Sequence, residues 1–138
     1  MLTDEHVLCA YADGSDLHDA APLLRSRLGA LLAGRRWATD QVVLVDQMHA
    51  PDPEHPDCLP DWDLGVNIGL DHIRRSAAWF ADVEALVECL VALHEESARD
   101  FAVFLAFRSR TWLQEHLAFI GGKPVDLPWL RKVIEKLA

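Results

Sequence analysis

The chain has 138 residues, of which 51% are hydrophobic, and a net charge of −9. This length is typical of one domain, and a domain of this size buries about two thirds of its unfolded surface without needing a disulfide or a metal. The negative charge argues against nucleic-acid binding, because an acidic surface repels phosphate groups. No apolar run approaches the ~18 residues that a membrane helix needs. We therefore expect a single domain over residues 1–138 with no membrane segment.

The first residues and the cysteines indicate a compartment. Asp4 and Glu5 stand where a secretory signal would carry basic residues. The three cysteines, Cys9, Cys58 and Cys89, are an odd number without a close pair, which is typical of reduced thiols. Both observations predict a cytoplasmic protein.

The first two predicted elements are a strand and a helix. Residues 7–12 form a short apolar run that the turn-forming pair Asp13-Gly14 ends. Leucines at helical spacing then predict a helix with Pro22 near its first turn and Gly34 at its end. These leucines are Leu17, Leu24, Leu28 and Leu31.

Two strands and a loop follow. Residues 41–46 are apolar on both faces, which predicts a strand in the centre of the sheet. Four prolines exclude regular structure from residues 49–60. Residues 61–70 alternate in polarity, which predicts a strand with one face buried beneath the helices. The apolar positions of this strand are Trp62, Leu64, Val66, Ile68 and Leu70.

The second half predicts two helices and a hairpin. Asp82 is expected to open an amphipathic helix. Residues 101–108 and 113–120 read as strands of a hairpin. Asp126 caps a last helix with Pro128 in its first turn. The order β-α-β-β-α-β-β-α predicts an α/β (α+β) fold with one mixed sheet of about five strands and three helices.

Histidines raise the question of a metal or acid–base site. His49, His55 and Cys58 lie among acidic residues in the proline-rich loop, but their spacing matches no zinc motif. A zinc-protease motif begins at His94, yet Ala98 stands where the second histidine is required. We therefore expect no metal site.

No common catalytic motif is present in the sequence. The chain has no G-x-S-x-G elbow, no Walker loop and no dinucleotide-binding fingerprint. His116 would act as a general base only if it lined a pocket. We expect no catalytic residue and no cofactor. A small hydrolase that uses His116 or the loop with His49 and His55 is the alternative.

Most of the excess negative charge lies in the N-terminal part. Residues 1–63 hold 12 acidic and four basic residues, whereas residues 64–138 hold ten acidic and nine basic residues. Carboxylates on a proline-stiffened loop can pair with a partner's Lys and Arg at small entropic cost. We expect the acidic segment to bind a partner, although an ordinary solvated loop is the alternative. The acidic segment comprises Asp46, Asp52, Glu54, Asp57, Asp61 and Asp63.

Four stretches resemble a known family of proteins. They are residues 13–18 (DGSDLH), 60–65 (PDWDLG), 79–86 (WFADVEAL) and 93–101 (LHEESARDF). They resemble small immunity proteins of bacterial polymorphic-toxin and contact-dependent inhibition systems, and in particular the family catalogued as immunity protein 70. This resemblance covers most of the chain. It implies a cytoplasmic, non-enzymatic protein that binds one cognate toxin domain, and it transfers no residue role.

The residues and the resemblance together predict an immunity protein whose partner is a basic toxin domain. Neither a nucleic acid nor a membrane is expected as a partner. A structural or regulatory module that dimerises through a strand edge or a Trp-rich surface is a further alternative, and a homodimer is compatible with either function.

Overall fold

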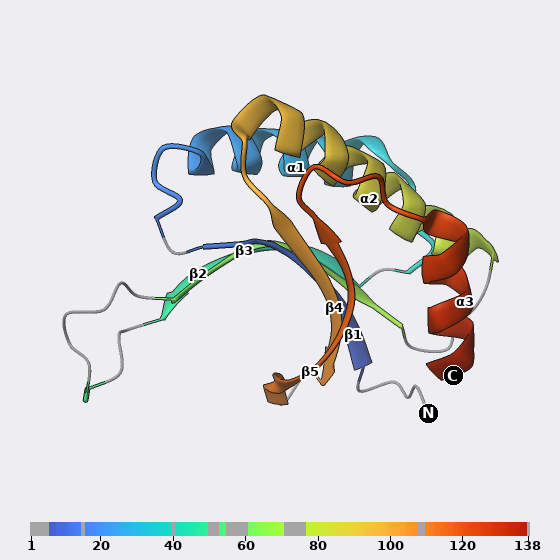
Figure 1. Ribbon diagram of the computed structural model, residues 1–138. Coiled ribbons are helices and arrows are strands. Elements are labelled where there is room, and N and C mark those ends of the chain that lie inside the picture. Colours follow the sequence, from blue (N-terminus) through green and yellow to red (C-terminus); the bar gives the residue numbers. More distant parts are fainter. Residues whose placement is uncertain are drawn as a thin grey trace.

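Within the described residues the chain forms five strands and three helices in the expected order (Figure 1). This computed structural model describes residues 6–14, 16–39, 41–49, 53–54, 61–70, 77–107 and 110–137. The elements are β1 (His6–Ala12), α1 (Ala21–Gly34), β2 (Val42–His49), β3 (Asp61–Gly69), α2 (Ala77–Ser97), β4 (Phe101–Phe107), β5 (Arg110–Ile120) and α3 (Leu127–Leu137). The α+β class and the element order are confirmed. None of the helices in these ranges is long and apolar enough to cross a membrane.

The strands form one sheet in the order β2-β3-β1-β4-β5. Every neighbouring pair is antiparallel, so the expectation of a mixed sheet is wrong. The reason is that two crossovers interleave. The connection β1-α1-β2 joins strands that run parallel, but β3 lies between them, and the connection β3-α2-β4 has β1 between its strands in the same way. Strands that run in the same direction are therefore never neighbours.

The position of β2 also differs from the expectation. β2 is an edge strand, although its apolar character on both faces predicted a central one. Val42 packs against the core, whereas Val43 is 52% exposed and Leu44 is 38% exposed. Two-sided apolarity describes a strand that could be covered on both faces, but it carries no information about which strands lie beside it.

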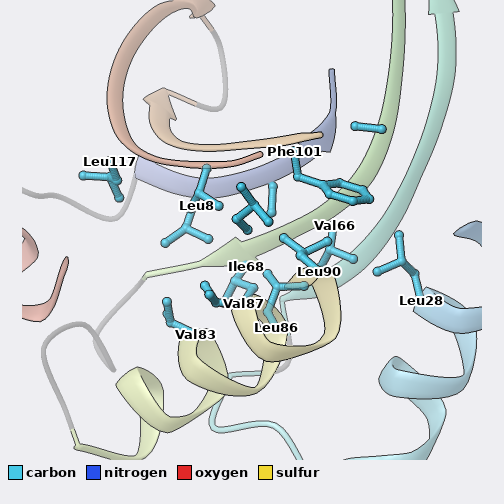
Figure 2. Packing of buried hydrophobic residues seen from close by; sticks show 14 of the residues in the cluster. Leu8, Leu28, Val66, Ile68, Val83, Leu86, Val87, Leu90, Phe101 and Leu117 are labelled. Atoms are coloured by element: carbon cyan, nitrogen blue, oxygen red, sulfur yellow. The ribbon is translucent and has the colours of Figure 1, made fainter. Parts of the chain in front are cut away.

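The alternating strand is buried under helices, as predicted. α1 and α2 lie side by side on one face of the sheet (Figure 1). Figure 2 shows Leu86 and Leu90 of α2 packed beside Val66 and Ile68 of β3. The residues of β3 that face the helices, with Leu70 directly after it, are all 6% exposed or less: Trp62, Leu64, Val66, Ile68 and Leu70.

The first long helix begins as predicted, with Pro22 in its first turn, whereas the second begins elsewhere. α1 starts at Ala21, after a turn that begins at the buried Leu17. The carbonyl oxygen of Leu17 accepts hydrogen bonds from the N–H groups of Ala20 and Ala21. α2 starts at Ala77, so Asp82 lies inside the helix and does not open it. Asp82 is buried, and its carboxylate is held by groups from the end of α1 and just after it. The sequence pattern therefore indicated that a helix starts at Asp82, whereas in the structure Asp82 lies within the helix and forms an ion pair with Arg35.

The C-terminal elements agree with the sequence. β4 and β5 pair antiparallel as a hairpin, with register shifts between Val103 and Phe104 and between Ala106 and Phe107. Asp126 caps α3, because its Oδ1 accepts a hydrogen bond of 3.0 Å from the N–H of Trp129. α3 packs against β5 and buries Leu130.

Candidate protein-binding surface

The pairing of β2 with β3 gathers half of the acidic segment at one end of the ladder. The last four rungs join residues 46–49 of β2 to residues 61–64 of β3. Asp46, Asp61 and Asp63 all lie within these rungs. The antiparallel register thus brings together carboxylate positions that are up to 17 residues apart in the chain.

The other acidic residues belong to the connection between the two strands. Glu54 lies in a turn and is exposed. Asp52 and Asp57 fall outside the described residues, and for Asp61 the structure describes the backbone alone. The structure therefore places Asp46, Glu54 and Asp63 with their side chains.

Asp46 and Asp63 lie on opposite faces of the sheet. Asp46 pairs with Leu64, which belongs to the face that the helices cover. Asp63 pairs with Gln47 on the other face. Because side chains alternate along a strand, a single flat partner surface cannot cover both carboxylates from one side. A partner would have to reach around the end of the ladder.

Asp46 is fixed by two side chains. Its Oδ2 accepts a hydrogen bond of 2.5 Å from Arg25 Nε, and its Oδ1 accepts one of 2.8 Å from Trp62 Nε1. These two donors, with Arg25 as the stronger, lower the pKa of the Asp46 carboxyl below its usual value. Arg25 also lies over the Trp62 ring, 5.9 Å from its centroid. Trp62 is buried here, in agreement with a core role, and it orients a carboxylate at the rim.

Asp63 lies on the sheet face opposite the helices, as do the polar side chains of Tyr11 and Asn67. The hydroxyl of Tyr11 donates a hydrogen bond of 2.6 Å to Asn67 Oδ1, and the Tyr11 ring meets Phe104 edge-on at 5.5 Å. Burial, with a smaller contribution from the charge of Asp63, raises the pKa of the Cys9 thiol to about 11. Cys9 is therefore protonated and unreactive at neutral pH.

Gly65 allows this face to pack. A Cβ atom at Gly65 would lie 1.9 Å from the carbonyl oxygen of Ala10 and 2.7 Å from Cδ1 of Tyr11. A methyl group has no room at either distance. Tyr11 of β1 lies directly opposite this glycine in the ladder.

The histidines do not assemble into a site in the described part of the chain. Nδ1 of His94 lies 2.9 Å from the carbonyl oxygen of Arg99 and 3.2 Å from Oδ1 of Asp100. His116 is exposed on β5, with its ring 5.7 Å from that of Phe104. His49 is described by its backbone alone, and His55 and Cys58 lie outside the described ranges. Among the residues that the structure describes, no group of three or more His, Cys, Asp or Glu could hold a metal ion.

Two shallow hollows lie where the end of α1 meets α2. One has a volume of about 450 Å³ and the other about 360 Å³, and Arg35 and Arg36 line both. Arg35 is already bound to Asp82, which itself lines the smaller hollow. A carboxylate beside the two guanidinium groups opposes the binding of an anion there.

The sequence did not indicate the basic partners of its acidic residues. Arg25 is 21 positions from Asp46. Arg99 binds two further carboxylates, with Nη2 2.6 Å from Oδ1 of Asp19 and Nη1 3.2 Å from Oδ1 of Asp16. The position of Arg25 on the predicted helix indicates only that its side chain is exposed. It does not indicate which acidic residue Arg25 contacts.

No protein-family model matches this chain, and no curated protein or solved structure is significantly similar to it. The resemblance to immunity proteins therefore rests on the four sequence stretches, and it supplies no residue roles.

Proposed function

We propose that this chain is a non-enzymatic immunity protein of the cytoplasm that binds a basic toxin domain through the loop end of the β2–β3 ladder. The observation that supports this best is the concentration of carboxylates there. Asp46, Asp61 and Asp63 occupy three of the last four rungs, and the exposed Glu54 follows β2. The resemblance of four stretches to immunity proteins supports a toxin domain as the partner.

The physical argument concerns the surface of the toxin. A toxin that cuts nucleic acid needs a basic surface to hold phosphate groups, so an acidic protein can occupy the place of the substrate. The −8 balance of residues 1–63 would also accelerate the encounter through long-range attraction. β2 and β3 hold the carboxylates of Asp46 and Asp63 on regular strands, which reduces the entropy lost on binding.

The test measures association between this protein and the toxin domain encoded beside it, by stopped flow at increasing salt. Changing Asp52, Glu54, Asp57 and Asp61 to the corresponding amides should slow association at low salt by about tenfold or more. The variant should also lose most of the salt dependence, because salt screens long-range attraction. The fold should survive, since exposed carboxylates contribute little to stability.

A matched control removes the same charge from another surface. Changing Glu84, Glu88, Glu95 and Glu96 of α2 to Gln alters the net charge equally but leaves the β2–β3 end intact. If the control variant associates as slowly as the loop variant, the slower association results from the change in net charge alone. That result would exclude the loop end of the β2–β3 ladder as the contact. A wild-type protein that neither binds nor protects against the toxin would exclude the immunity function itself.

A further inference from the structure

β2 is an edge strand without the usual protection against pairing. Its sequence, VVLVDQMH, contains no Lys and no Pro. Val43, Leu44 and Met48 are 52%, 38% and 46% exposed. Natural edge strands are commonly blocked by charges, prolines or bulges, because a flat apolar edge pairs with other strands. The pairing of β2 with β3 is also continuous from Val42 to His49, without a register shift.

The backbone of β2 offers hydrogen-bonding groups outward in a defined pattern. The N–H of Gly69 donates to the carbonyl oxygen of Gln41 at 2.8 Å, so residue 41 directs its backbone groups toward β3. Because this direction alternates in an antiparallel ladder, the odd-numbered residues of β2 also face β3. The outward groups are then those of Val42, Leu44, Asp46 and Met48. No strand in the described part of the chain pairs with them.

We propose that two copies of this chain pair through β2 in antiparallel orientation, with Leu44 facing Leu44 of the second copy. The pairing would join the two five-stranded sheets into one continuous sheet. Leu44 would exchange backbone hydrogen bonds with its counterpart, and Val42 would do so with Asp46 of the second copy. All of these are residues whose backbone groups point outward.

Most side chains match in this register; the exception is Val42, which lies opposite Asp46, a carboxylate already bound by Arg25 of its own chain. Val43 lies opposite Val45 of the second copy on the face away from the helices. Gln41 lies opposite Gln47 of the second copy on the same face. Leu44 meets its counterpart on the helix-covered face and loses its exposure to water. Cross-strand pairs of apolar side chains stabilise a sheet.

Charge favours a second copy at this edge over a basic partner. Residues 41–48 contain one charged side chain, Asp46, and Arg25 already binds it. Residues 41–45, beside and including the central Leu44, therefore carry no charge that would attract a basic strand. They also form a stretch at which two proteins of net charge −9 can approach with little repulsion.

The antiparallel orientation also separates the acidic ends. His49 lies five residues beyond Leu44, so at about 3.4 Å per residue the two His49 positions would lie roughly 34 Å apart. Salt screens charges over about 8 Å at physiological ionic strength. Asp46 lies within the paired strands, but the acidic residues beyond His49 do not repel those of the second copy strongly and stay accessible. This proposal does not depend on toxin neutralisation.

The test is sedimentation equilibrium of the full chain over a range of concentrations. The wild type should show a monomer–dimer equilibrium, and Leu44→Lys should weaken association at least tenfold, because it places two lysines against each other on the two-fold axis. Phe119→Lys is the matched control, since Phe119 is an exposed residue (56%) of the opposite edge strand. This control should associate like the wild type.

A cross-linking experiment tests the register and does not require the lysine variant to fold. In a Cys58→Ser background, Leu44→Cys should form a disulfide-linked dimer under mild oxidation, whereas Val43→Cys should not. Cross-linking through position 43 would overturn the register. A wild type that stays monomeric, or a dimer that only Phe119→Lys disrupts, would overturn pairing through β2. A monomer whose Leu44→Lys variant loses toxin binding would assign this edge to a partner's strand and overturn the second copy as its occupant.

Discussion

Two arginines from the region of α1 each bind one aspartate, in opposite surroundings. Arg35 binds Asp82 with an Nε–Oδ1 distance of 3.0 Å, and the Asp82 side chain is 2% exposed. Arg25 binds Asp46 with an Nε–Oδ2 distance of 2.5 Å, and the Asp46 side chain is 31% exposed. The distances suggest two similar ion pairs. Burial separates them, because a charge taken out of water must be compensated within the protein and a charge at the rim need not be.

The buried pair joins the end of α1 to α2. Besides Arg35, the Asp82 carboxylate accepts a hydrogen bond of 2.7 Å from the N–H of Ala38. The guanidinium of Arg35 lies 5.5 Å from the centroid of the Trp37 ring, and Trp37 Nε1 donates a 3.1 Å hydrogen bond to the carbonyl oxygen of Leu32. Asp82 thus fixes the chain that leaves α1. The exposed pair orders one side chain at the sheet edge.

The largest effect is expected from breaking the buried pair. Asp82→Ala leaves the Arg35 guanidinium and the Ala38 N–H without their acceptor. It should therefore lower the free energy of unfolding by about 2–3 kcal/mol, because the Ala38 N–H loses its acceptor while Arg35, with 32% of its side chain exposed, can be hydrated. Urea denaturation followed by circular dichroism measures this change. Glu88→Ala, at an exposed position of the same helix, is the control and should stay within about 0.5 kcal/mol of the wild type. A loss below about 1 kcal/mol for Asp82→Ala would contradict the contrast between the two pairs.

An intermediate effect of opposite sign is expected at the end of α2, where neither ion pair is touched. Ala98 follows the helix with φ = 57°, a conformation that favours glycine, and its N–H donates to the carbonyl oxygen of His94 at 2.9 Å. Ala98→Gly should raise the free energy of unfolding by about 1 kcal/mol, because it removes the contact between Cβ and the backbone. Ala92→Gly, within the helix, should instead lower it. A stability loss at position 98 would argue against the left-handed helix end.

The smallest effect is expected from the exposed pair. Asp46→Asn should lower the free energy of unfolding by less than about 1 kcal/mol at pH 7. The pKa of Asp46 is lowered in the folded state, so its ionic contribution is present above the ordinary pKa near 3.9 and is lost as the pH falls through the folded-state value. The difference between wild type and variant should therefore shrink on acidification. Urea titrations at pH 7 and pH 2 measure it, and a difference that grows at pH 2 would contradict the assignment.

The sequence determined the features that depend on neighbouring residues. The alternation of residues 61–70 predicted which face of β3 is buried, and Asp126 with Pro128 predicted the start of α3. The hairpin of β4 and β5 followed from two apolar runs and a short polar link. Each of these features is decided within a few positions along the chain, so the local pattern is sufficient.

Only the tertiary structure decided which distant residues meet. The sequence marked β2 as central and Asp82 as a helix start, because an apolar run and an acidic residue have the same local appearance in either setting. β2 became an edge when the two crossovers interleaved, and Asp82 became buried because Arg35, 47 positions away, lies beside it. The acidic segment was recognised as a composition, but the pairing of β2 with β3 placed Asp46 and Asp63 on opposite faces. Contacts of this kind depend on topology, which no local periodicity encodes.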